Sequence, residues 1–292
     1  MCITKNLDND SESKLKIQEE KGKFTEIQNI IKGEMKSNQD KIKMLVKGLS
    51  DPNGLVRRSY AEELGNIGKP ALPELINALL NSQEVIQRRA AAKTLKLVGD
   101  PSALPYLTKA LTNDADPVVQ CSAAGAIAIF GESAVKHLII ILENQEHTEM
   151  QHGLAAWCLA FIGANAPNAI KKAAQSKNNN VKSAAISALE EHIRQSQDQE
   201  AIELVKNSID ESNENIQIEA IKLVGKLYKI KSLIPLLIKK LKNKSPDIRK
   251  ASVLSLMQLN IKESRNNIKE LLEIEQDKNV RKIIQLALKK ID

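Results

Sequence analysis

Residues 99–131 read GDPSALPYLTKALTNDADPVVQCSAAGAIAIFG, and they form one complete unit of an internal repeat. The second half of this unit, from Val119, aligns column by column with VRRSYAEELGNIG from Val56, QRRAAAKTLKLVG from Gln87 and QHGLAAWCLAFIG from Gln151. Four less regular copies follow: VKSAAISALEEHI from Val181, IQIEAIKLVGKLY from Ile216, IRKASVLSLMQLN from Ile248 and VRKIIQLALKKID from Val280. Successive copies are 30 to 35 residues apart, which is the spacing of a stacked repeat protein.

Each copy has the apolar spacing of a helix. In the first copy, the apolar residues at i, i+4, i+8 and i+11 lie on one stripe: Val56, Tyr60, Leu64 and Ile67. Alanine pairs occupy the middle of the next three copies (Ala91 and Ala92, Ala123 and Ala124, Ala155 and Ala156). Such small residues predict that a neighbouring helix packs close by, near the lower end of the roughly 8–10 Å interaxial range. A glycine then ends the helix at Gly68, Gly99, Gly131 and Gly163.

Another apolar helix precedes each of these. The clearest segments are ALPELINALL (71–80), ALPYLTKAL (103–111), AVKHLIIIL (134–142) and LIPLLIKKL (233–241). Pro73, Pro105 and Pro235 stand in the first turn, where a missing N–H costs little. The repeat unit is therefore a helical hairpin. The sequence predicts an all-α fold, an α-solenoid (superhelix) of about eight hairpins, with a bend or a looser joint near residues 193–199 because one step there is 35 residues long.

The units resemble HEAT repeats, within the wider armadillo-like helical class, and in particular the short repeats of phycobilisome lyase subunits. The resemblance rests on Gly-Asp-Pro at 99–101, Ala-x-Pro at 103–105, Asp-Pro-x-Val at 116–119 and the alanine-rich middle. It covers about residues 39–292 and is strong as far as Gly163. The resemblance implies a solenoid fold. It also implies phycobilin lyase activity as one function of such proteins, and that activity needs a supply of bilin and usually a partner subunit. Deoxyhypusine hydroxylase also resembles this architecture, but it binds iron through His-Glu pairs, and no histidine here is followed by glutamate.

The sequence predicts three regions. Residues 1–38 form a charged N-terminal tail with a capping helix, residues 39–163 a regular half of the solenoid, and residues 164–292 a less regular, basic half. From Lys222 to Asp292 there are 18 Lys and Arg against 7 Asp and Glu, in a chain whose net charge is +7. Lysines on solvated outer helix faces account for this excess, and a patch that attracts nucleic acid is the alternative.

The residue content excludes several classes of protein. No apolar run approaches the roughly 20 residues that span a bilayer, and no signal segment is visible, so we expect a cytoplasmic protein without a membrane partner. Cys2, Cys121 and Cys158 are too few for a disulfide framework or a zinc site, and the sequence favours Cys121 and Cys158 as core residues. Nucleotide-binding and zinc-hydrolase motifs are absent, and the ligand-rich segment EHTEMQH (146–152) is best explained as a solvated turn. We therefore expect no catalytic residue, cofactor or metal.

The candidate site is the face of the second helices opposite the buried stripe, expected on the concave side. The residues predicted to bind a partner there are Arg58, Arg89, Lys93, Lys96, Cys121, Gly125, Gly153, Trp157, Lys222, Lys250 and Leu254. This face is basic at both ends and small or apolar in the middle, where the sole tryptophan of the chain lies. Trp157 either anchors a partner or fills space above Gly153 as a packing residue, and the sequence leaves both interpretations open.

The leading functional hypothesis is a non-enzymatic scaffold or adaptor that binds a protein or peptide, with acidic ends, on the concave face. No small-molecule substrate is evident from the sequence. A nucleic-acid-binding protein that uses the basic C-terminal part is the alternative, although aromatic residues for base stacking make up only 2% of the chain. A lyase-type enzyme, or a chaperone for a chromophore or a metalloenzyme, is the further alternative.

Overall fold

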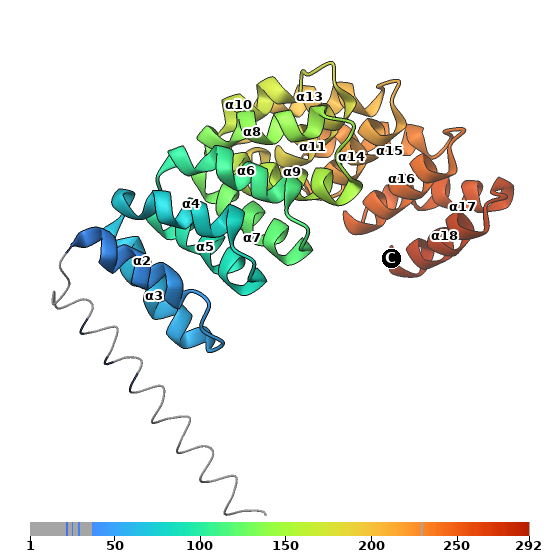
Figure 1. The fold of residues 1–292 in the computed structure, drawn as a ribbon. Coiled ribbons are helices and arrows are strands. Elements are labelled where there is room, and N and C mark those ends of the chain that lie inside the picture. The colour runs from blue at the N-terminus through green and yellow to red at the C-terminus, as the bar shows by residue number, and fades with distance from the viewer. Residues whose placement is uncertain (1–21, 23–24, 26–28, 30–36, 229, 292) are drawn as a thin grey trace, which may run out of the picture. The chain divides into compact units, whose positions relative to one another are not determined.

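The computed structural model describes residues 37–228 and 230–291 and, before them, Gly22, Thr25 and Asn29. In these residues, helices are present and strands are not. Helical pairs follow one another in chain order within two compact units, one ending at Phe130 and the other beginning at Gly131 (Figure 1). The prediction of an all-α repeat fold is confirmed. The predicted tail and capping helix over residues 1–38 lie almost wholly outside the described residues, and the division into a regular and a less regular half stays a prediction.

The helices pair as the sequence predicts. The first unit contains α2 (Asn38–Gly48) with α3 (Gly54–Ile67), α4 (Leu72–Asn81) with α5 (Val85–Val98), and α6 (Leu104–Asn113) with α7 (Pro117–Ile127). The second unit contains α8 (Glu132–Glu143) with α9 (Glu149–Ile162), α10 (Pro167–Ala173) with α11 (Asn179–Ala188), the short α12 (Glu190–Ser196), α13 (Gln199–Ile209) with α14 (Glu214–Val224), α15 (Ile234–Lys240) with α16 (Pro246–Gln258), and α17 (Arg265–Ile274) with α18 (Lys278–Lys290). Among the helices of the described ranges, none is long and apolar enough to cross a membrane.

Local sequence explains where the helices begin and end. Pro117 is the first residue of α7, and the side chain of Asp116 accepts hydrogen bonds from two backbone N–H groups of the first turn. Gly99 ends α5 with a φ of 69°, a left-handed conformation that glycine adopts without strain. Gly163 differs from this prediction because its φ is −16°. Glycine is required there for another reason, since a Cβ would collide with the carbonyl oxygen of Ala188.

The long repeat step contains a short additional helix, α12. Gln197 ends it in the left-handed conformation, with a φ of 52°. Asp198 then caps α13, and its carboxylate lies 2.9 Å from His192 Nε2 and accepts a hydrogen bond of 2.9 Å from Lys171 Nζ. These two partners, His192 first, hold the pKa of Asp198 well below its ordinary value. Polar contacts therefore fasten the segment where the sequence predicts a looser joint.

The alanine pairs of the second helices pack as predicted in the first unit. Ala91, Ala92, Ala123 and Ala124 are fully buried, where α5 packs against α3 on one side and α7 on the other. In the second unit, Ala155 is buried but Ala156 is only half-buried and faces a groove. The alanine pattern thus predicts close packing correctly except at Ala156.

A polar side chain at one repeated position clamps most of the second helices to the loop before them. This clamp position is the second residue of each aligned copy, and it contains Arg57, Arg88, Gln120, His152, Lys182, Gln217, Arg249 and Arg281. Six of these side chains donate a hydrogen bond to the backbone carbonyl oxygen six residues earlier (Arg57, Arg88, Gln120, Gln217, Arg249 and Arg281). Because a loop carbonyl near a helix start has no helical partner, the clamp satisfies it and fixes the hairpin.

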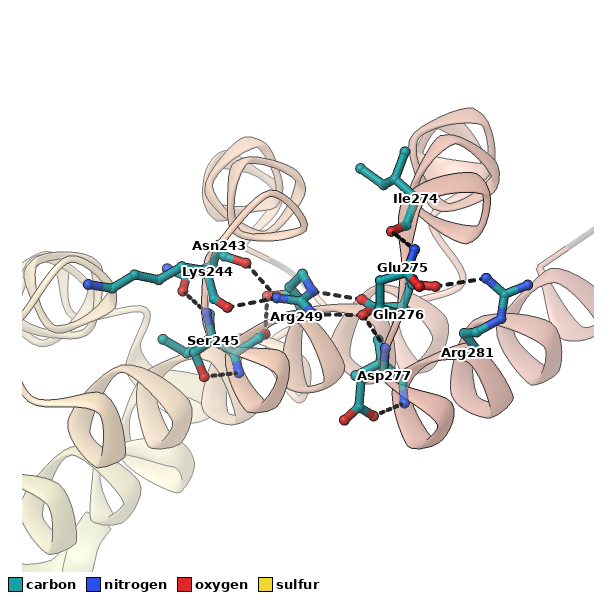
Figure 2. Close-up of polar contacts among 12 residues, drawn as sticks. Asn243, Lys244, Ser245, Arg249, Ile274, Glu275, Gln276, Asp277 and Arg281 are labelled. Carbon is teal, nitrogen blue, oxygen red and sulfur yellow. Dashed lines mark hydrogen bonds and ion pairs between the residues drawn. The ribbon is translucent and has the colours of Figure 1, made fainter.

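Arg88, Lys182 and Arg249 also join neighbouring repeats through an acid in the following loop. Arg249 makes a bidentate pair with Glu275, with Nε and one terminal nitrogen each 2.7 Å from a carboxylate oxygen (Figure 2). The Glu275 side chain is fully buried and that of Arg249 is 15% exposed. The equivalent pairs in other repeats are Arg88 with Asp114 and Lys182 with Glu211. The same Glu275 also accepts the clamp of its own hairpin, because Arg281 donates to its backbone carbonyl at 2.8 Å.

Some lysines of the basic C-terminal region form ion pairs with carboxylates of the same unit. Lys240 is buried, and its Nζ lies 2.8 Å from a carboxylate oxygen of Asp210 and 3.0 Å from the side-chain oxygen of Gln217. Lys222 and Lys226 pair with Glu219 and Glu190. These lysines have structural partners, so they are not part of a free cationic patch; the buried Lys240 also differs from the solvated helix faces that the sequence predicts.

We expect Ala124→Leu to destabilise the protein by about 1–3 kcal/mol, because a larger side chain must separate helices that meet through small residues. Ala156→Leu is the matched control, since the half-buried Ala156 has open space in front of it. Urea midpoints of the two variants measure the difference. Equal losses for both would show that burial at these two positions does not differ as described.

We expect Glu275→Gln to lower the free energy of unfolding at pH 7 by about 1.5–3 kcal/mol, the range for a hydrogen bond to a charged group. Arg249 holds the pKa of Glu275 below its ordinary value, so the charged pair stabilises the fold above about pH 4.3, the usual glutamate pKa. This contribution disappears as the pH falls through the lowered pKa. Denaturation at pH 7 and near pH 3, with the exposed Glu273→Gln as control, tests both statements; a gap that persists unchanged at the lower pH contradicts them.

Candidate functional site

The first unit has a groove on its layer of second helices, which we call the basic groove. Its volume is about 600 Å³, and α3, α5 and α7 line it. Six residues predicted from the sequence lie along it: Arg58, Arg89, Lys93, Lys96, Cys121 and Gly125. The structure therefore brings these predicted residues together, and that they bind a ligand stays a prediction.

The cations of α5 form an uncompensated stripe in the basic groove. Arg89, Lys93 and Lys96 are spaced i, i+4 and i+7, so they lie on one face of the helix. No described acidic side chain pairs with any of the three, and Arg89 Nε is buried without a described hydrogen-bond partner. Arg58 differs, because its Nε lies 2.7 Å from Glu62 on the same helix. Like charges at this spacing destabilise a helix by a few tenths of a kcal/mol per pair, so the stripe favours a negatively charged ligand.

Apolar side chains flank these cations and were not predicted as part of the site. Ile86 and Leu97 line the basic groove and are 41% and 51% exposed. Leu55 and Val118 hold the position of Ile86 in the neighbouring repeats and are 64% and 44% exposed. Leu55, Ile86 and Val118 each come directly before the first residue of an aligned copy, and this repetition was the sequence signal for the apolar rim of the basic groove. The basic groove thus combines cations with a small floor, where a Cβ on Gly125 would meet no atom within 4 Å.

The second unit has a groove at the equivalent position, which we call the mixed groove. Its volume is about 810 Å³, and α9, α11, α14 and α16 line it. Four predicted residues lie along it: Gly153, Lys222, Lys250 and Leu254. Its other polar residues were not predicted, and they include the amides Asn180 and Asn215, the hydroxyls Ser183 and Ser187, and the acids Glu149 and Asp247. The predicted residues therefore fall into two groups, one in each unit.

Trp157 lines neither groove. It is 51% exposed on α9, and its ring centroid lies 5.8 Å from that of Phe161, which is 57% exposed. A Cβ on Gly153 would meet nothing within 4 Å, so the indole does not fill the space above Gly153. The packing interpretation of Trp157 is not what the structure shows, and the anchor interpretation stays a prediction.

The two described cysteines have different environments. Cys158 is buried, and burial raises the pKa of its thiol to about 12, which keeps it protonated and unreactive. Cys121 is exposed and lines the basic groove, in contrast to the core position predicted from the sequence. In the part of the chain that the structure describes, no group of three or more His, Cys, Asp and Glu side chains could hold a metal ion.

Comparison with known proteins places the chain in a family. A family model described as HEAT repeats matches residues 42–128, 72–155 and 202–289. The bilin biosynthesis protein MpeU of Synechococcus sp. (strain WH8020) is 36% identical over 261 residues, which cover 89% of this chain and 88% of that protein. The chain belongs to the HEAT-repeat family that includes MpeU. This relation confirms the resemblance seen in the sequence.

Solved structures agree on the fold. Kap121p bound to Nup53p is similar with a TM-score of 0.62 and 13% identity, covering 87% of this chain and 34% of that one. The complex of CpcE and CpcF of phycocyanin lyase from Nostoc sp. PCC7120 covers 89% of this chain and 98% of that one at 18% identity, with a TM-score of 0.35 that is too low to support an argument. The first of these likenesses supports a HEAT solenoid and no particular activity.

The relation to MpeU corrects the leading functional hypothesis. The prediction of a non-enzymatic scaffold or adaptor is wrong, and so is the prediction that the chain is not an enzyme, because its relative is a protein of bilin biosynthesis. The further alternative, a lyase-type enzyme or chromophore chaperone, is the one that the relation favours. The hypothesis failed because the groove residues are spread over several repeats and form no local metal or nucleotide motif that would mark an enzyme.

We expect Lys93→Glu to stabilise the protein by about 0.5–1 kcal/mol, because a carboxylate there forms i,i+4 and i,i+3 pairs with Arg89 and Lys96 in place of two repulsions. Thermal melting at low salt measures this gain, and the same measurement at high salt should shrink it. A loss of stability at low salt would show that Lys93 is already neutralised in the ligand-free protein.

Proposed function

We propose that the chain is a lyase-type protein that binds a bilin in the basic groove and promotes its attachment to a cysteine of an acceptor phycobiliprotein. The observation that carries this proposal is the 36% identity to a bilin biosynthesis protein over 89% of the chain. Because the two proteins match over nearly their whole lengths, the comparison concerns the complete repeat array rather than one shared module.

The chemistry of the basic groove supports a bilin as its ligand. A bilin is an elongated, largely apolar tetrapyrrole that carries two propionate carboxylates. The stripe of Arg89, Lys93 and Lys96 offers charged partners for carboxylates, and the guanidinium of an arginine can make two parallel hydrogen bonds to one carboxylate. Ile86 and Leu97 offer apolar contact area beside these cations. The volume of about 600 Å³ lies inside the roughly 300–1,000 Å³ range of small-molecule sites.

The proposed reaction needs positioning more than acid–base groups. The thiol of the acceptor adds across a carbon–carbon double bond of a bilin side group: one S–C bond forms, the S–H bond breaks, and the proton ends on the neighbouring carbon. Atoms balance, and no oxidant or reductant is consumed. A groove that holds the bilin by its two carboxylates fixes the position of the reactive end, and such positioning of a reactant lowers the barrier substantially.

Biliverdin, a bilin with both propionates, is a suitable binding probe. We expect saturable binding with an induced circular dichroism signal, weakened at least tenfold by Arg89→Glu or Lys93→Glu because each replaces an attraction by a repulsion. Gly125→Leu should also weaken binding, since its side chain extends into open groove space. The exposed Lys136→Glu on α8 is the charge-matched control. Equal affinity of all these variants would remove the basic groove from the proposal.

Alkylation of Cys121 gives an independent readout of the same site. In a Cys2→Ser background, bound biliverdin should slow the reaction of the exposed Cys121 with iodoacetamide. Cys158 is the internal control, because its buried thiol should react slowly with or without the ligand. An unchanged Cys121 rate at saturating biliverdin would place the ligand elsewhere.

A further inference from the structure

The mixed groove has a different chemistry from the basic groove at equivalent repeat positions. Where the basic groove has Ile86 on its rim, the mixed groove has the amides of Asn215 and Asn180, the second of which also donates a hydrogen bond of 3.2 Å to the backbone carbonyl of Leu142. Where the basic groove has Lys93 without a described partner, the mixed groove has Lys222, which already pairs with Glu219 at 2.8 Å. Amides present both donors and acceptors, as a polypeptide backbone does. Lys250 has no described acidic partner, but the acids Glu149 and Asp247 line the same groove. The mixed groove therefore fits a ligand of balanced polarity rather than an apolar dianion.

The length of the mixed groove also indicates a polymer. A second groove of about 590 Å³ continues it, because both are lined by Ser187, Glu219, Lys222 and Leu254. The lining helices α9, α11, α14 and α16 each pack on the next. At roughly 8–10 Å between helix axes, three such steps span about 24–30 Å. An extended polypeptide at about 3.3 Å per residue covers that distance with about seven to nine residues.

An exposed aromatic pair stands beside the mixed groove. Trp157 and Phe161 lie on α9, the helix that presents Gly153 and Ala156 to the groove. Both rings are more than half exposed in a chain that contains one tryptophan and three phenylalanines. Exposed aromatic rings of this kind are enriched among the residues that dominate protein–protein binding energy. The pair therefore supplies an anchor next to the polar contacts of the groove.

We infer that the mixed groove, with Trp157 and Phe161 at its edge, binds an extended segment of the acceptor polypeptide. The identity of this occupant rests on the proposed function, which requires an acceptor protein as well as a bilin. The two ligands then use separate surfaces: cations and apolar side chains in the basic groove bind the bilin, and amides, hydroxyls and an aromatic pair in the mixed groove bind the polypeptide.

The test uses the full chain and the bilin-free phycobiliprotein subunits of the organism that encodes it. We expect one subunit to bind, and Gly153→Leu and Trp157→Ala each to weaken that binding tenfold or more while biliverdin binding stays unchanged. Gly153→Leu should leave the fold intact, because its Cβ meets nothing within 4 Å and leucine suits a helix better than glycine. The matched control is Gly125→Leu, which should weaken biliverdin binding and leave subunit binding unchanged.

The outcomes separate this inference from the proposed function. Subunit binding that is equally strong in the wild type, Gly153→Leu and Trp157→Ala overturns the inference even if biliverdin binds as expected. The absence of binding by every subunit overturns it as well. Failure of biliverdin to bind the wild type overturns the proposed function, whereas a subunit bound through Gly153 and Trp157 would still support the polypeptide surface.

A spectroscopic measurement checks the position of the contact. Because the chain has a single tryptophan, incorporation of 5-fluorotryptophan gives one ¹⁹F resonance, which reports on Trp157 alone. Addition of the unlabelled subunit should shift this resonance as the half-exposed ring is covered, and addition of biliverdin should not. A resonance that is unchanged at saturating subunit places the contact away from the aromatic pair and contradicts the inference.

Discussion

The hydrogen bond from the clamp position to the preceding loop fixes the geometry on which both grooves depend. Gln120 donates to the carbonyl of Asp114, and Arg249 donates to those of Asn243 and Lys244. In the helices that line the grooves, the next residue, such as Cys121 or Lys250, faces the groove. The clamp side chain therefore fixes where the helix starts, and with it the direction in which the next side chain points. Where an acid of the next loop joins the clamp, as Glu275 does, spacing between repeats is fixed by the same contact.

A solenoid of this kind separates folding from recognition. The buried stripe and the clamp recur with little change, while the residues between them differ from one repeat to the next. Lys93 and Lys222 hold equivalent positions, but the first has no described acidic partner and the second pairs with Glu219. The same helix layer can thus present a cationic surface in one unit and a surface of amides, hydroxyls and charges of both signs in the other without changing how the helices pack.

The architecture was readable from the sequence because it depends on contacts that are local or repeated. Leu64 and its equivalents mark the core, and Gly99 marks a helix end that only a left-handed residue can form. The groove positions lie opposite the buried stripe on each second helix, so the helical period predicts positions such as Arg89 and Lys93. The pair between Arg249 and Glu275 joins residues of different hairpins, so no short motif announces it. The exposure of Trp157 depends on neighbouring helices. The motifs at residues 99–131 indicated a resemblance to phycobilisome lyase subunits, but only the relative favours bilin biosynthesis over a scaffold function.

The uncompensated stripe of Arg89, Lys93 and Lys96 also has a consequence for the lifetime of the protein. In a repeat array each hairpin is stabilised by its neighbours, and α5 lies between α3 and α7. Charge repulsion along α5 lowers the cost of local opening there, and an open second repeat exposes the buried alanines of both adjacent interfaces to proteases. An anionic ligand removes that repulsion and closes the weak point. Occupied molecules would then survive longer in the cell than empty ones, which couples the amount of the protein to the supply of its ligand.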